Sequence, residues 1–152
     1  MGLGLHLAVV CDFVLCSTDA QFSEPFCRRG FSVDSGGSFL LPRLIGIRRA
    51  RQMLILGTTV DAASAADWGL VDEVVDPAAL DDAAAAMATT LAAGPTFSLG
   101  HTKELLNRRA ATDLAAALRA EADAVEATIR SADFKEGIRA FGQRREPVFS
   151  GQ

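Results

Sequence analysis

The stretch Gly30-Phe31-Ser32-Val33-Asp34-Ser35-Gly36-Gly37 decides how the first part of this chain folds. It is a glycine-rich turn before an apolar segment, and its one carboxylate is Asp34. Because aspartate ahead of small residues favours a helix start, Asp34 is predicted as the N-cap of a helix over Ser35–Leu41. The paired glycines also let a ligand or backbone approach closely, which would suit the carboxylate to proton transfer. The two interpretations are compatible.

Composition excludes several classes of protein. The 152 residues are enough for one domain with a buried core. A net charge of −4 argues against nucleic acid as a partner, because phosphate binding needs a positive surface. No apolar run approaches the ~20 residues that span a bilayer. The opening Met1–Val10 lacks the basic residues of a signal peptide, so a cytoplasmic protein without membrane contact is expected.

The cysteines point in the same direction. Cys11, Cys16 and Cys27 are odd in number and lie in or beside apolar segments. They are predicted to be reduced, buried thiols of a cytosolic protein. The sequence has no cluster with metal-ligand spacing, and no metal is expected.

The chain divides at Gly94-Pro95. Before it, short helices alternate with short apolar strands. Helices are predicted over Gly2–Val10, Ser38–Leu44, Ile47–Leu56, Ala62–Trp68 and from Pro77 onward, and strands over residues 13–16, 70–71 and 74–75. Asp61 is predicted to cap one helix, Asp76 another, and Gly57 and Gly69 to end helices.

The segment after this boundary is predicted to be helical throughout. One apolar stripe contains Leu114, Ala117, Leu118, Ala122, Val125 and Ile129, and Phe134, Ile138 and Phe141 continue it after Ser131, a predicted cap. Such stripes need a covering surface, which the same subunit or a neighbouring copy could supply.

Other polar residues carry weaker signals. His6 on an apolar segment is more often structural than catalytic, and Glu24 before Pro25 is predicted to be a solvated turn residue. The pattern Gly2-x-Gly4 at a helix start leaves backbone N–H groups free for an anion, although this signal alone is weak.

Several motifs together resemble one family. Residues 2–12, with Leu7-Ala8 and Cys11-Asp12, resemble the glycine turn and helix of the crotonase (enoyl-CoA hydratase/isomerase) family. Further matches follow in the family's order, at residues 21–25, 41–46 and 66–71 and between Asp133 and Arg145. The resemblance runs from Met1 to about Gly151.

The resemblance implies an α/β fold. Residues 1–94 are expected to form the later part of a crotonase-like ββα spiral core whose N-terminal half is absent, and residues 95–152 a helical trimerisation region. The implied ligand is an acyl-CoA thioester, with coenzyme A entering as part of the substrate and no separate cofactor. A homo-oligomer, either a trimer or a dimer of trimers, is also implied.

The resemblance also implies site residues. An enolate of the thioester would be held by two backbone N–H groups, one of them that of Leu3, while the second donor lies upstream of this chain. Substrate-binding positions would be Gly2, Gly4 and Phe26, together with Phe141 and Arg144, which would face the coenzyme A of a neighbouring subunit.

Acid–base positions separate the possible reactions. The two glutamates of the hydratases align with His6 and Phe26, and phenylalanine exchanges no proton. Asp34 aligns with the catalytic aspartate of isomerase and dehalogenase members. Three hypotheses follow: an isomerase that shuttles a proton through Asp34, a hydratase that uses His6 or Glu24, and a truncated, non-catalytic fragment that acts through oligomerisation or a partner half.

Overall fold

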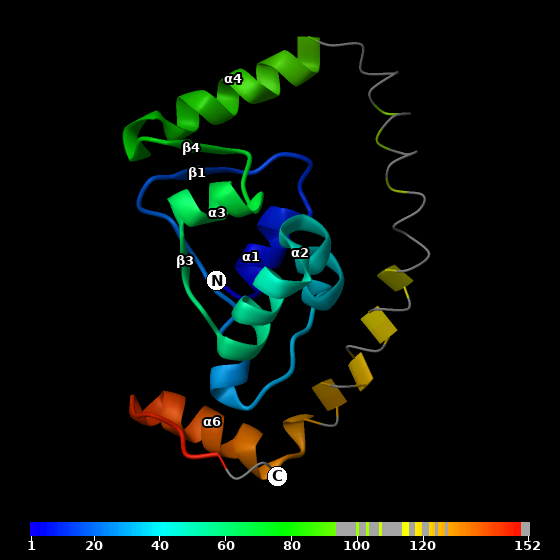
Figure 1. The fold of residues 1–152 in the computed structure, drawn as a ribbon, viewed down its shortest axis with the longest axis vertical. Helices are drawn as coiled ribbons and strands as arrows, with labels where there is room; N and C mark the ends of the chain where they lie inside the picture. Colours follow the sequence, from blue (N-terminus) through cyan, green and yellow to red (C-terminus); the bar gives the residue numbers. More distant parts are fainter. Residues whose placement is uncertain are drawn as a thin grey trace.

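The computed structural model describes residues 1–93, 100, 103, 107, 114–115, 118–119, 122–123, 125–126 and 128–149. Helix α1 (Leu3–Val9) and helix α2 (Gly37–Leu56) lie side by side at the centre (Figure 1). The other elements are β1 (Leu15–Ser17), β2 (Gln21–Phe22), η1 (Cys27–Arg29), β3 (Val60–Asp61), α3 (Ala62–Trp68), β4 (Glu73–Val75), η2 (Pro77–Ala79), α4 (Leu80–Ala93) and α6 (Ala132–Gln143).

Two small sheets join segments that are far apart in sequence. β1 pairs in parallel with β4, with Cys16 opposite Val74. β2 pairs antiparallel with β3, with Phe22 opposite Val60. Residues 70–71 do not form a strand as predicted. They follow the end of α3 at Gly69 and are buried in the core, and the strand pairing begins only at Glu73.

Helix α2 carries a break that the sequence predicts. Gly46 has φ 76° and ψ 156°, which is not a helical conformation, so the segment consists of two helical stretches. These correspond to the predicted helices over Ser38–Leu44 and Ile47–Leu56. Pro42 lies in the second turn of α2, where its missing N–H leaves one intrahelical bond unmade.

Side-chain caps begin several elements as predicted. Asp61 Oδ1 accepts a bond from the Ser64 N–H at 2.7 Å, and Asp76 Oδ1 accepts from Ala78 at 2.9 Å. Ser131 Oγ accepts from the Phe134 N–H at 2.9 Å and begins α6. Each cap satisfies a backbone N–H that the first turn of a helix leaves without a partner.

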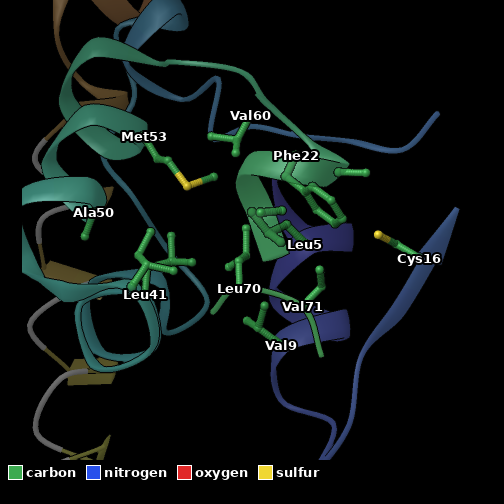
Figure 2. Packing of buried hydrophobic residues seen from close by; sticks show 13 residues of the cluster. Leu5, Val9, Cys16, Phe22, Leu41, Ala50, Met53, Val60, Leu70 and Val71 are labelled. Atoms are coloured by element: carbon green, nitrogen blue, oxygen red, sulfur yellow. The ribbon is translucent and has the colours of Figure 1, made fainter. Parts of the chain in front are cut away.

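The core lies between α1, α2 and the segment around α3 (Figure 2). Leu41 and Met53 of α2 are fully buried, and Leu5 of α1 and Val71 pack in the same cluster. Burying each such side chain contributes about 1.5–3 kcal/mol.

The cysteine prediction holds only in part. All three cysteines are free thiols; Cys16 is buried, Cys27 is half-buried and Cys11 is exposed. Burial raises the pKa of the Cys16 thiol. Cys11 is exposed because it follows the end of α1, beyond the face that packs on the core.

Helix α6 packs against η1 through two glycines. A Cβ at Gly137 would lie 2.1 Å from the Arg29 carbonyl oxygen, and one at Gly30 would lie 2.6 Å from the Asp133 carbonyl oxygen. On the same helix Ile138 and Phe141 are exposed. Of the earlier stripe, Leu118 and Ile129 are exposed, whereas Ala117 and the boundary Gly94-Pro95 lie outside the described residues.

Within the part of the chain that the structure describes, no helix is both long and apolar enough to cross a membrane.

Candidate active site around Asp34

Asp34 does not cap a helix, contrary to the sequence prediction. The N-cap of α2 is Gly36, with φ 87° and no side-chain cap bond. Ser35 (φ 50°) and Gly36 both adopt left-handed conformations, which turn the chain before α2 begins. The Gly37 N–H donates to the Asp34 carbonyl oxygen at 3.0 Å, so the backbone of Asp34 closes this turn and its side chain is available for another role.

The Asp34 carboxyl group is held in an unusual environment. Its Oδ1 is buried, and it has no hydrogen-bond partner among the residues that the structure describes. A buried polar atom without a partner costs about 1–3 kcal/mol, so such atoms in a native protein usually serve a ligand or bind water. Asp34 therefore remains the candidate catalytic carboxylate of this turn.

Two further titratable groups, His6 and Glu24, lie close to the same turn. His6 of α1 is 2 % exposed and Glu24 is 0 % exposed, and His6 Nε2 lies 3.0 Å from Glu24 Oε1. The atoms are at ion-pair distance, but their angles do not meet hydrogen-bond geometry. The distance is the more informative of the two, because a small rotation of the ring changes the angle and leaves the proximity unchanged.

The solvated role predicted for Glu24 is wrong, because the side chain is fully buried. Phe22, Ser23 and Glu24 are all buried, because this segment runs beside the start of α1, where the Gly2 N–H bonds the Ser23 carbonyl at 2.9 Å. No local pattern in the sequence marks this burial, because it depends on the packing of the segment against α1.

Gly37, in the turn after Asp34, packs directly against the His6 ring of the His6–Glu24 pair. A Cβ at Gly37 would lie 2.5 Å from His6 Nε2 and 2.7 Å from Val33 Cγ2. The space above Gly37 is therefore filled by the imidazole and the valine, and only glycine fits there.

Aromatic rings connect this site to α6. Phe26 lies 6.1 Å from the His6 ring and 5.6 Å from the Phe31 ring, and Phe31 lies 5.7 Å from Phe134 of α6. These tilted pairs are favourable contacts between ring edges and faces. Phe26 also covers Gly2, where an added Cβ would meet its ring at 3.6 Å.

The start of α1 has the predicted glycine turn. Gly2 adopts φ 55° and donates its N–H to the Ser23 carbonyl at 2.9 Å. The first intrahelical donor is Leu5, which bonds the Gly2 carbonyl, so the N–H groups of Leu3 and Gly4 precede the helical bonding pattern. Leu3 lies one helical turn before His6 on α1.

The structure does not join Phe141 and Arg144 to this cluster. The Arg29 guanidinium lies over the Phe141 ring at 4.6 Å, and Phe141 is exposed. Arg144 ends α6 in a left-handed conformation with φ 53°. Across the described part of the chain, no hydrogen bond, ion pair or ring contact links either residue to Asp34 or His6.

A separate hollow of about 540 Å³ lies between β1 and α4, lined by Asp12, Phe13, Leu15, Leu80, Asp81, Ala84, Met87, Ala88 and Leu91. Its lining is mostly apolar and includes none of the predicted site residues. The candidate active site is therefore the group of polar residues around Asp34. The described residues contain no group of three or more potential metal ligands.

Comparisons with known proteins identify the family and the fold of the chain. The whole chain, residues 1–152, matches the family model described as Enoyl-CoA hydratase/isomerase. It is 38% identical over 151 residues to 1,2-epoxyphenylacetyl-CoA isomerase of Escherichia coli (99% of this chain, 58% of the relative). It is 32% identical over 155 residues to carnitinyl-CoA dehydratase of Citrobacter koseri (99% of this chain, 59% of the relative).

Among solved structures, an enoyl-CoA hydratase from Mycobacterium avium subsp. paratuberculosis superposes with a TM-score of 0.93 at 36% identity. The superposition covers 98% of this chain and 61% of that one. The prediction of a crotonase-like α/β fold is thus confirmed, and the chain spans about three fifths of the length of these proteins.

Proposed function

Because this chain belongs to the enoyl-CoA hydratase/isomerase family, we propose that it acts on an acyl-CoA thioester as an isomerase, with Asp34 moving the proton. The observation that carries this proposal is the buried, unpaired Oδ1 of Asp34 on a turn of two left-handed residues. The Phe26 ring lies 6.1 Å from that of His6 and cannot exchange a proton, which disfavours reactions that need a carboxylate at that position.

The proposed step needs one acid–base group. The Asp34 carboxylate removes a proton from a carbon next to the thioester carbonyl, and the electron pair becomes an enolate. The resulting carboxylic acid returns the proton to a different carbon of the conjugated system, so the double bond moves and no atom is gained or lost. Proton transfer by a positioned side chain typically contributes 10²–10⁴-fold to rate.

The remaining predicted residues would bind the substrate. The Leu3 N–H would donate to the enolate oxygen, as the family resemblance implies. Gly2 and Gly4 would give the thioester close access to the backbone, and Phe26 would form an apolar wall. Phe141 and Arg144 are exposed, which suits the proposed contact with coenzyme A bound to a neighbouring subunit.

Hydration is the second candidate function. The close approach of His6 and Glu24 provides the carboxylate and imidazole that water activation would use. The product separates the two reactions, because hydration adds one water to the acyl chain whereas isomerisation leaves its mass unchanged.

A non-catalytic role is the third candidate, since the chain spans only 58% of the length of the E. coli relative. In each case we propose a homo-oligomer. Ile138 and Phe141 are 49% and 64% exposed on α6, which favours cover by another copy. Sedimentation velocity is expected to show an assembly larger than a monomer, and a compact, cooperatively folding monomer would contradict this.

The experiment is a titration of the purified chain with a panel of enoyl-CoA thioesters that reports affinity, assembly state and products. We expect isomerised thioester from the wild-type chain and a loss of about 10²–10⁴-fold in turnover for Asp34→Asn, with binding nearly intact. Asp67→Asn, which changes an exposed carboxylate, is the matched control.

Equal turnover in the wild type and Asp34→Asn would contradict the assignment of Asp34. Binding without turnover by the wild-type chain would instead favour the non-catalytic candidate, and a product heavier by one water would favour hydration.

A further inference from the structure

We propose that His6 and Glu24 are positioning residues, which hold the Gly36–Gly37 turn and so fix the direction of the Asp34 carboxylate. The functional part of this inference rests on the proposed role of Asp34. The structural part, that the pair holds the turn, stands on the geometry alone.

The burial of the pair indicates a role beyond stability. Both side chains are excluded from solvent, and neither ring nitrogen of His6 nor either carboxyl oxygen of Glu24 has a hydrogen-bond partner among the described residues. The attraction across 3.0 Å is then their main compensation for lost hydration. Apolar residues of similar volume in place of a buried polar pair commonly leave the stability of the fold unchanged or raise it. An interior built only for stability would favour them.

The contact with Gly37 shows what the pair acts on. The imidazole occupies the place where a side chain at Gly37 would begin, with Nε2 2.5 Å from that position. The Gly37 N–H in turn bonds the Asp34 carbonyl at 3.0 Å. A shift of the ring would therefore open space at one end of the turn whose other end carries Asp34.

Glu24 fixes the ring from the other side. It lies in the connection after β2, which is anchored because the Gly2 N–H bonds the neighbouring Ser23 carbonyl at 2.9 Å. Because the backbone next to Glu24 is held in place, its carboxylate can keep His6 in contact with Gly37. This chain of contacts runs from β2 through His6 to the Asp34 turn.

The test compares local protection of the turn with global stability. The double variant His6→Leu/Glu24→Leu removes both polar groups while keeping the interior filled, so its Tm is expected to equal or exceed that of the wild type. Amide hydrogen exchange is then measured over residues 33–40 and, as an internal reference, over α3. The matched control Glu126→Gln/Arg130→Gln removes an exposed ion pair that lies outside both measured segments.

We expect exchange over residues 33–40 to rise about tenfold in the double variant, with α3 unchanged and with no change in the control. With substrate, kcat should fall while KM stays constant. Unchanged exchange at the turn would overturn the proposal. A uniform rise over both segments together with a lower Tm would also overturn it, because the pair would then be merely structural.

If the double variant does not fold, His6→Gln and His6→Ala decide the question. Glutamine retains a polar side chain that can contact Glu24, so the turn should stay protected in His6→Gln and lose protection in His6→Ala. Equal exchange in the two variants would refute the proposal. Because exchange needs no substrate, an inactive wild type with these exchange results would overturn only the isomerase assignment.

Discussion

Gly37 and Gly137 both lack room for a side chain, and their neighbours differ in kind. A Cβ at Gly37 would lie 2.5 Å from the imidazole of His6, whereas one at Gly137 would lie 2.1 Å from the backbone carbonyl of Arg29. A side chain can rotate away, but a backbone held in η1 cannot. The contact at Gly137 therefore fastens α6 to the rest of the chain (Figure 1), and the contact at Gly37 places a titratable ring.

The largest effect is expected at the backbone contact. Gly137→Ala would force α6 away from η1 and should lower the free energy of unfolding by about 3 kcal/mol. Gly142→Ala on the same helix is the control, because a Cβ there meets nothing within 4 Å. It should stabilise the helix by up to about 1 kcal/mol. Urea unfolding measures both, and equal stabilities would show that α6 can shift without cost.

Much of the local structure, but not this contact, is predictable from sequence. Asp61 and Ser131 are caps that need only their own next three residues, and the structure confirms both. The approach of Gly137 to Arg29 joins residues more than a hundred positions apart, and no local pattern reports it. The candidate site also combines a local feature with a long-range one. Its glycine turn can be predicted from the sequence, whereas the buried contact between His6 and Glu24 depends on how α1 packs beside β2.

Asp34 shows why a correct motif can carry a wrong structural detail. An aspartate before Ser-Gly-Gly is typical of an N-cap, yet two left-handed residues follow it and α2 begins only at Gly37. The backbone conformation of Ser35 decided this, and serine adopts φ > 0 too rarely for sequence alone to predict it.

An intermediate effect is expected at Gly37, and it can be rescued. Gly37→Ala should lower the free energy of unfolding by about 2 kcal/mol, because its methyl group would overlap the His6 ring. Adding His6→Ala should recover part of this loss, since the second change removes the overlapping atoms. Gly4→Ala in α1, where a Cβ meets nothing within 4 Å, is the control. Independent, additive effects of Gly37→Ala and His6→Ala would contradict the contact.

The smallest effect concerns Glu136 of α6, a carboxylate that has the hydrogen-bond partners that the buried pair lacks. Glu136 Oε1 accepts from Arg145 Nη1 at 2.6 Å, and Oε2 accepts from Nη2 at 3.1 Å. The Val148 N–H adds a bond to Oε1 at 3.2 Å. The hydrogen bond from Arg145 and that from Val148 lower the pKa of Glu136 from its ordinary 4.5 to about 2.

The sign of the resulting pH dependence follows from this lowered pKa. The unfolded chain takes up the proton more readily than the folded one, so the contribution of Glu136 is complete above about pH 4.5 and disappears as the pH falls to about 2. The Tm difference between the wild type and Glu136→Gln should therefore shrink over that interval. The residue is near the surface, so the effect should be small and weaker in high salt. A Tm difference that is constant down to pH 2 would mean that the Arg145 contact does not hold the tail in solution.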